Sequence, residues 1–271
     1  MKRKIIFSGC SFTWGQSLWA YENISDIPNA YEWTQKGKII SEEIQNTRIK
    51  YRYPNLVCNS LGNYEPVVKK LNGGSDEESV YFINMLMNNI KFDDGLYDEE
   101  VDSELVDAIV FQTTQEYRSS YNFEHKGKKY KLYSEPNMEN ISRVDEWEWN
   151  EKYLHYNPIP SKIDRFVDYC IDNNISPEDF AKQHRKIWIT EIKNILKQFK
   201  DKGKKVFLLC WTDEYLEEIK KDKFLKSIFV PLKYDDKSFD CINDLYDYNE
   251  EMRIDKHIKN RDMGFDEHPS S

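Results

Sequence analysis

The sequence lacks a long apolar run, a regular pattern of cysteines and an excess of positive charge, and each absence excludes a class of protein. No stretch of about 18 or more apolar residues occurs, and the apolar run near the amino end is too short for a signal peptide, so we expect neither a membrane span nor export. The cysteines are odd in number, widely spaced and without a C-x-x-C pair, which indicates neither a disulfide framework nor a zinc site. They are Cys10, Cys58, Cys170, Cys210 and Cys241. A cytoplasmic protein without a metal is therefore expected.

The balance of charge is acidic. The chain has 48 acidic and 39 basic residues, for a formal charge of −9, and the acids are spread along its length. This distribution argues against nucleic acid as a partner. Of the 271 residues, 39% are hydrophobic and 14% aromatic, which is enough to bury a substantial core. We expect a single domain over residues 1–271, with irregular surface insertions at about 21–50 and 119–165.

Apolar runs of strand length alternate with segments of helical period. The expected strands are 5–7, 66–71, 107–114, 206–211 and 228–230, and the expected helices are 52–63, 72–90 and 176–203. Short strands without polar alternation are typical of parallel sheets covered on both faces. The pattern predicts an α/β fold, a three-layer α/β/α sandwich with a mainly parallel, flavodoxin-like sheet of about five strands.

Two of the expected helices carry clear start and stop signals. The helix over 52–63 has Pro54 in its first turn and Gly62 as its C-cap, and we expect it to turn Leu56, Val57, Ser60 and Leu61 to the core. The helix over 176–203 has Ser176 as its N-cap and ends at Gly203. Its apolar stripe is expected to be Phe180, Ile187, Trp188, Ile192, Ile195 and Phe199.

The first strand ends in the tight turn Ser8-Gly9-Cys10-Ser11. In open α/β sheets the chemistry lies where strands end and helices begin, and the first N–H groups of a helix have no partner inside the helix. Ser11 therefore stands where a nucleophile would, although a serine there can also simply cap the helix. Cys10 is a second candidate, because a thiol at a helix N-terminus is acidified, or it is a small buried packing residue.

A serine nucleophile needs a base, and the base needs a group that orients it. The segment FDEHPS near the carboxyl end offers Asp266 and His268. In an extended segment, residues two apart point to the same side, so Asp266 can orient His268. The four other histidines have no comparable neighbours along the sequence.

Three of these segments, FSGCSFTWG, NGGSDEES and FDEHPS, together resemble the motif blocks of the SGNH (GDSL-like) hydrolase superfamily, in its divergent phage and bacterial form. The resemblance implies that Ser11 is the nucleophile, His268 the base and Asp266 the orienting acid. It implies an oxyanion hole made by the N–H groups of Ser11 and Gly73, with Gly74 as the near alternative to Gly73. The spacing here is Asp-x-His where the family has Asp-x-x-His.

The third block departs further from the family. Where the family has Gly-x-Asn-Asp, this chain has FQTTQEYR. Thr114 falls at the asparagine position and is the expected third oxyanion donor, and Arg118 resembles the arginine of a Thr-x-x-x-Arg variant that contacts substrate.

The resemblance implies a serine esterase that acts on a small acyl ester without a metal or organic cofactor. O-acetyl groups on a glycan are the candidate substrate, because the insertion at 119–165 is rich in aromatic residues. Two alternatives remain open. One is a binding or structural protein that keeps the fold without turnover, and the other is an O-acyltransferase that uses the same triad.

Overall fold

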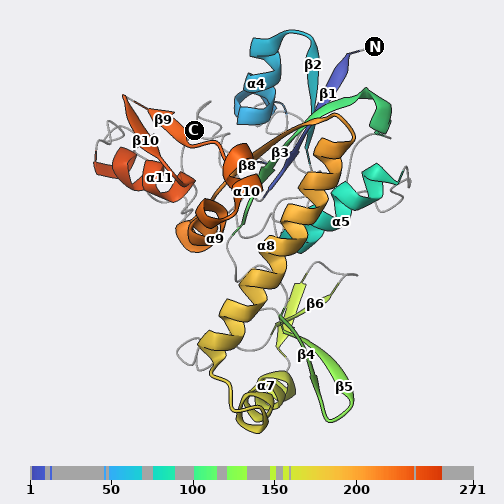
Figure 1. Cartoon of the computed structure of the whole chain (residues 1–271), viewed down its shortest axis with the longest axis vertical. Helices are drawn as coiled ribbons and strands as arrows, with labels where there is room; N and C mark the ends of the chain where they lie inside the picture. Colours follow the sequence, from blue (N-terminus) through green and yellow to red (C-terminus); the bar gives the residue numbers. More distant parts are fainter. Residues whose placement is uncertain are drawn as a thin grey trace.

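In the computed structural model of the chain, the described residues are 2–9, 13, 46, 49–68, 76–88, 101–114, 121–132, 147–150, 155–158, 160–234 and 236–251. They form a parallel sheet surrounded by helices, and a smaller lobe at the far end of the longest helix (Figure 1). No helix among them is long and apolar enough to cross a membrane.

The sheet has four parallel strands in the order β2-β1-β3-β8. These are β1 (Arg3–Ser8), β2 (Tyr64–Val68), β3 (Val106–Gln112) and β8 (Lys205–Leu209). In β1, five of the six residues are buried, because side chains on both faces of the strand are covered. The predicted α/β fold with a mainly parallel sheet is thus confirmed. The strand expected at 228–230 is a single parallel bridge between Leu208 and Phe229.

Alternate residues of β1 enter two different apolar clusters. Ile6 belongs to the larger cluster, to which helices α5 (Asp76–Met87) and α8 (Pro177–Asp201) contribute. Ile5 and Phe7 belong to a smaller cluster that includes Cys58 of α4 (Tyr53–Leu61). The apolar core therefore lies on both faces of the sheet.

Helix α4 confirms its predicted ends but not its predicted face. Pro54 lies in the first turn, and Gly62 has a φ of 77° and donates its N–H to the Cys58 carbonyl at 3.0 Å. The buried residues of the helix are Pro54 and Cys58, whereas the residues expected at the core are exposed, among them Leu56 (49%), Val57 (40%) and Leu61 (52%). The predicted buried face was therefore wrong. The residues of α4 that contact the core are Pro54 and Cys58, which lie four residues apart on one face of the helix.

Helix α8 begins as predicted. The Ser176 hydroxyl oxygen accepts the N–H of Asp179 at 3.0 Å, and Pro177 occupies the first turn. The stripe is buried as expected except for Ile187, which is 51% exposed. Residues adjacent in a helix point about 100° apart, and at this turn the buried face is made by Trp188 and Ile189, both 6% exposed, which leaves Ile187 outside it.

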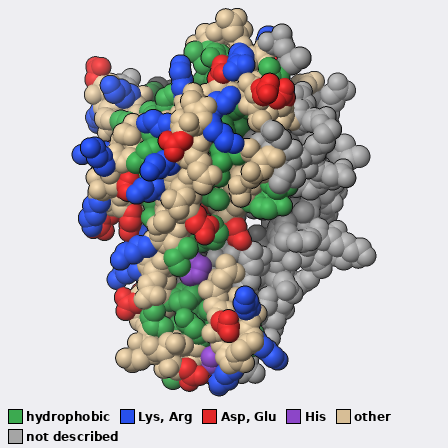
Figure 2. Space-filling model, turned by 45° about the vertical axis from the view of Figure 1, so that its right-hand side comes forward, with side chains coloured by type: hydrophobic (Ala, Val, Ile, Leu, Met, Phe, Trp, Pro, Cys, Tyr) green, Lys and Arg blue, Asp and Glu red, His purple; other side chains and the backbone are tan. Residues whose placement is uncertain are grey.

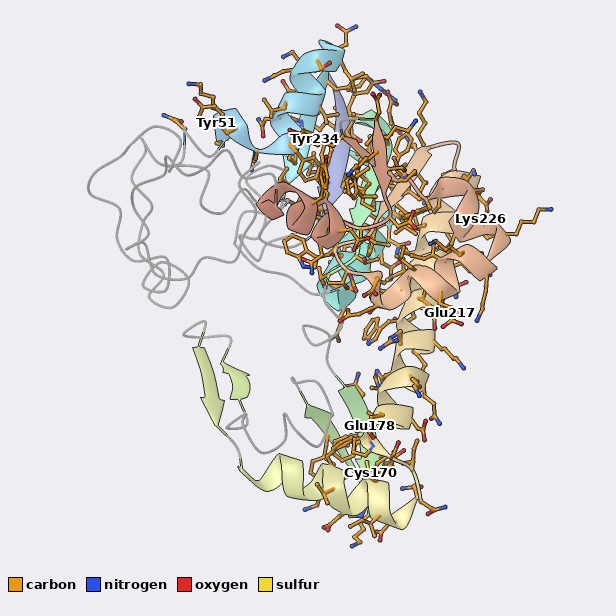
Figure 3. The ribbon with its side chains drawn as sticks, turned by 90° about the vertical axis from the view of Figure 1, so that its left-hand side faces the viewer. Tyr51, Cys170, Glu178, Glu217, Lys226 and Tyr234 are labelled. Carbon is orange, nitrogen blue, oxygen red and sulfur yellow. The ribbon has the colours of Figure 1, made fainter. Side chains whose placement is uncertain are left out.

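The segment expected to be an irregular insertion at 119–165 contains regular structure. It holds the hairpins β4 (Tyr121–His125) with β5 (Lys128–Leu132) and β6 (Trp147–Asn150) with β7 (His155–Pro158), and it leads into α7 (Pro160–Asp172). Phe123, Phe166, Cys170 and Phe180 form an apolar cluster separate from those of the sheet. We call β4, β5, α7 and the first turns of α8 the small lobe (Figure 3, where Cys170 and Glu178 are labelled). The insertion expected at 21–50 lies largely outside the described residues.

After β8 the chain completes the larger cluster. The elements are η4 (Asp213–Tyr215), α9 (Leu216–Lys221), α10 (Lys223–Ile228), β9 (Leu232–Tyr234), β10 (Lys237–Phe239) and α11 (Ile242–Glu251); η2 (Ser103–Leu105) precedes β3. Asp222 caps α10 by accepting the N–H groups of Phe224 and Leu225, and it pairs with Lys193 of α8 at 2.5 Å. These short helices were not predicted. Tyr215 and Ile219 are nevertheless fully buried.

Candidate functional site

Polar side chains are buried at the carboxyl ends of β1 and β3, the two central strands of the sheet. Because Ser8 pairs with Phe111 in register, both strands end at the same edge. Six polar residues there are between 0% and 4% exposed, and we call them the carboxyl-edge cluster: Ser8, Thr13, Asp76, Gln112, Thr113 and Thr114. This is the edge at which open α/β sheets bind ligands.

The turn after β1 is held at both ends. A Cβ at Gly9 would lie 2.3 Å from Oγ1 of Thr13 and 3.1 Å from Cβ of Gln112, so only glycine fits. The Thr13 hydroxyl donates to Oε1 of Gln112 at 2.8 Å and lies 3.3 Å from the Tyr53 hydroxyl. Gly9 and Thr13, which flank the predicted nucleophile Ser11 in the sequence, are thereby fixed to each other and to β3.

Asp76 links the start of α5 to the end of β3. Its Oδ1 accepts the backbone N–H of Thr114 at 2.8 Å, and the carboxyl group is completely buried. Burial raises the pKa of Asp76 from 3.8 to about 7, although hydrogen bonding by Thr114 and Tyr215 opposes the shift, and the charge of Glu214 adds to it. Near neutral pH the carboxyl group therefore exists in both protonation states.

Of the predicted site residues, Thr114 is the one that the structure describes. It is fully buried, and its backbone N–H is bonded to Asp76. The others lie outside the described residues: Ser11, Gly73, Arg118, Asp266 and His268, together with the alternatives Cys10 and Gly74. Residues of three segments quoted above nevertheless meet at one edge: Gly9 belongs to FSGCSFTWG, Asp76 to NGGSDEES, and Thr114 to FQTTQEYR.

Of the carboxyl-edge cluster, sequence reasoning singled out only Thr114 as a site residue. It missed Thr13, Asp76 and Gln112, whose side chains or neighbours form the hydrogen bonds of the cluster. Their burial depends on where β3 ends relative to β1 and α5, which local pattern does not encode. The signal that was available is the polar run Gln112-Thr113-Thr114 directly after an apolar strand.

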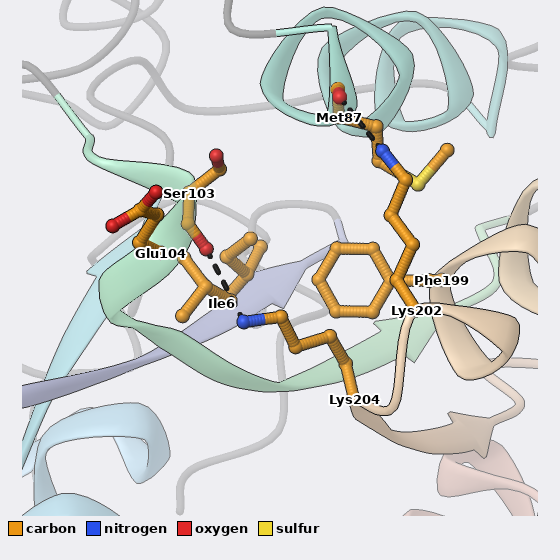
Figure 4. Close-up of a pocket in the computed structure, with 8 residues that line it drawn as sticks. Ile6, Met87, Ser103, Glu104, Phe199, Lys202 and Lys204 are labelled. Atoms are coloured by element: carbon orange, nitrogen blue, oxygen red, sulfur yellow. Dashed lines mark hydrogen bonds between the residues drawn. The ribbon is translucent and has the colours of Figure 1, made fainter.

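A cavity of about 250 Å³ lies at the opposite end of the sheet (Figure 4). Ile6, Val106 and Phe199 are among the residues that line it, and two lysines stand at its rim. Lys202 donates to the Met87 carbonyl at 2.9 Å, at the end of α5, and Lys204 donates to the Ser103 carbonyl at 3.4 Å. Both ammonium groups are thus bonded to backbone carbonyls, Lys202 at the last residue of α5 and Lys204 at the first residue of η2, which is a structural use, and the cavity is remote from the carboxyl-edge cluster.

The described thiols and histidines are also structural in their surroundings. Burial raises the pKa of the Cys58 and Cys170 thiols to about 11 and of the Cys210 and Cys241 thiols to about 12, which disfavours the reactive thiolate. One of the other histidines nevertheless has an acidic partner that is distant in the sequence: Nε2 of His125 lies 2.8 Å from Oδ2 of Asp172. This pair belongs to the small lobe and ties β4 to the end of α7.

Comparison of the chain with protein-family models, curated proteins and solved structures finds no significant match. Within the part of the chain that the structure describes, no group of three or more histidine, cysteine, aspartate or glutamate side chains could hold a metal ion. On the face drawn in Figure 2, acidic and basic side chains are interspersed. The carboxyl-edge cluster is accordingly the best-defined candidate site among the described residues.

Proposed function

We propose that the protein is a serine esterase of the SGNH type that acts on a small acyl ester. The observation that carries the proposal is the convergence, at the carboxyl edge of a parallel sheet, of residues from the segments FSGCSFTWG, NGGSDEES and FQTTQEYR. Gly9 adds to it, because its backbone is too close to Thr13 and Gln112 for a side chain. The proposal includes the finer fold: a three-layer α/β/α sandwich whose sheet has about five strands.

In the proposed mechanism, the Ser11 hydroxyl attacks the ester carbonyl while His268 takes its proton. His268 then gives the proton to the departing alcohol, and water releases the acyl group from Ser11 by the reverse sequence. Asp266 orients the imidazole. The N–H groups of Ser11 and Gly73, with Thr114, stabilise the oxyanion, and each such donor is worth about 10²–10³ in turnover. Arg118 contacts the substrate, and the mechanism requires no metal or organic cofactor.

The proposed substrate class is an O-acetyl group on a glycan. The hairpin of β6 and β7 supports it, because Trp149 of β6 is paired in register with Tyr156 of β7 and Trp147 lies at the start of the same hairpin. Aromatic rings offer flat apolar surfaces with polar edges, against which sugar rings pack well.

The test is reaction of the purified protein with a fluorophosphonate probe, read by intact mass. We expect one adduct on the wild-type chain, none on Ser11→Ala, and a strongly reduced labelling rate on His268→Ala. Thr190→Ala is a matched control, since its hydroxyl is exposed on α8 and donates to the Lys186 carbonyl. The esterase proposal fails if the folded wild-type protein takes up no probe, or if Ser11→Ala is labelled as fast as the wild type.

One observation favours a second candidate, a binding or structural protein of the same fold. Thr114 is fully buried, its N–H is bonded to Asp76, and its hydroxyl also interacts with the Asp76 carboxyl group, so both of its donors are already engaged. Under this reading Ser11→Ala leaves ligand binding unchanged and no probe reacts. An O-acyltransferase would instead react with the probe and transfer acetyl groups to an added sugar faster than to water.

A further inference from the structure

We infer that Thr13 and Asp76 are positioning residues that tie two segments to one common anchor, the end of β3. Thr13 ties the segment of the proposed nucleophile Ser11, and Asp76 ties the segment of the proposed oxyanion donor Gly73. The inference rests on the proposed function for its catalytic consequence. Its structural basis is two buried hydrogen bonds, from the Thr13 hydroxyl to Gln112 and from the Thr114 N–H to Asp76.

The anchor itself is rigid. Gln112 and Thr114 lie at the end of β3, a strand with a hydrogen-bonded neighbour on each side. Gln112 pairs in register with Leu209 of β8, and the N–H of Thr113 donates to the Leu209 carbonyl at 2.9 Å. All three polar residues of this strand end are completely buried. Groups bonded here are held by the centre of the sheet.

Thr13 fixes the first segment. It is 1% exposed, its hydroxyl is bonded to Gln112, and the same oxygen fills the space where a Cβ of Gly9 would lie. Ser11 is two residues from Gly9 and two from Thr13 in the sequence. Gly9 and Thr13 are thus both held against the end of β3. Loss of the Thr13 hydroxyl should therefore release the residue that follows Ser11 by two positions.

Asp76 fixes the second segment. It is the first residue of α5, a helix held on the sheet by Phe82 and Ile83, which are 2% and 0% exposed. Its carboxyl group accepts the Thr114 N–H directly, so the start of α5, which follows Gly73 by three residues in the sequence, is held at the end of β3.

The chain offers a matched control for a role in stability alone. Thr113 is as buried as Thr13 and lies at the end of β3, but its hydroxyl has no hydrogen-bond partner among the described residues, so no hydrogen bond joins it to Thr13 or Asp76. Thr113→Val removes a buried hydroxyl without breaking either tie.

The experiment measures the saturation kinetics of fluorophosphonate labelling, well below the lowest melting temperature of the set, for Thr13→Val, Thr13→Ser, Asp76→Ala, Asp76→Asn and Thr113→Val. We expect Thr13→Val and Asp76→Ala to lower the maximal labelling rate about 10- to 100-fold with an unchanged half-saturating probe concentration. Thr13→Ser, Asp76→Asn and Thr113→Val should stay within about threefold of the wild type, because the first two keep the hydrogen bond. The inference is overturned if Thr13→Val and Asp76→Ala behave like Thr113→Val.

Hydrogen–deuterium exchange separates this inference from the proposed function. If the wild-type protein takes up no probe, the esterase proposal fails, while the two ties are still measurable. Thr13→Val should then speed exchange in the peptide that contains Gly9, and Asp76→Ala in the peptide that contains Thr114, relative to Thr113→Val. Equal exchange in all three variants would show that neither residue fixes its segment.

Discussion

The Asp76 carboxyl group has to be both buried and able to accept a hydrogen bond, and these demands set its pKa. Burial outweighs the stabilisation by Thr114 and Tyr215, so the pKa rises from 3.8 to about 7. The folded protein then binds a proton that the unfolded chain has already lost. The contribution of this proton to stability is complete below the unfolded pKa and disappears as the pH rises through the folded pKa.

We therefore expect Asp76 to lower the free energy of unfolding between about pH 4 and pH 7 by up to about 4 kcal/mol. Asp76→Asn, which cannot ionise, should show a flatter dependence over the same interval. Urea unfolding of both proteins across this range checks the prediction. Parallel curves for the two proteins would mean that Asp76 does not hold its proton through folding.

A second prediction about a single residue concerns Gly9. Its missing side chain leaves room for the Thr13 hydroxyl, so Gly9→Ala should cost about 1–3 kcal/mol of stability through overpacking. Thr13→Ala removes the oxygen that the new Cβ would meet. In a double-mutant cycle, Gly9→Ala should cost less on the Thr13→Ala background than on the wild type. Additive effects would contradict the close contact.

Among the helices and strands, those with local signals were predicted and those that depend on distant partners were not. Ser176, Pro177 and Gly203 mark α8 in the sequence, because caps and breakers act on their own backbone. The ends of α4 were predicted equally well, but its buried face was not, because that face depends on how Cys58 packs against the sheet. Helix α7 was missed although its apolar residues, among them Phe166, Val167 and Cys170, recur at helical spacing; what the local pattern did not reveal is the packing of Phe166 on Phe123 of β4.

The tie between β4 and α8 should be sensitive to acid. Nε2 of His184 lies 3.2 Å from the backbone N of Asn122, and burial lowers the pKa of His184 from 6.5. A lowered histidine pKa contributes stability that is present above the unfolded value and is lost as the pH falls below it. We expect the difference in melting temperature between His184→Gln and the wild type to shift in favour of the variant as the pH falls from about 7.5 to about 5. A difference that does not change with pH would show that His184 does not make this tie sensitive to acid.

For the molecule as a whole, the separation of the apolar clusters predicts two levels of stability. Phe166→Ala should cost about 3–5 kcal/mol, because Phe166 is completely buried in the small-lobe cluster. Hydrogen exchange should speed up in β4 and β5 while β1 and β3 stay protected. Phe207→Ala, at a side chain that is 39% exposed, is the control and should change little. Uniformly faster exchange through the sheet would show one cooperative unit.

Helix α8 joins these two clusters as a single 25-residue element with neither glycine nor proline after its first residue. At about 1.5 Å per residue it is about 37 Å long. It carries Phe180 into the small-lobe cluster and Phe199 into the cluster under the sheet. Sharp bends in helices need a proline, a glycine or an inserted group. The helix is therefore stiff along its whole length. It connects the small-lobe cluster rigidly to the cluster under the sheet.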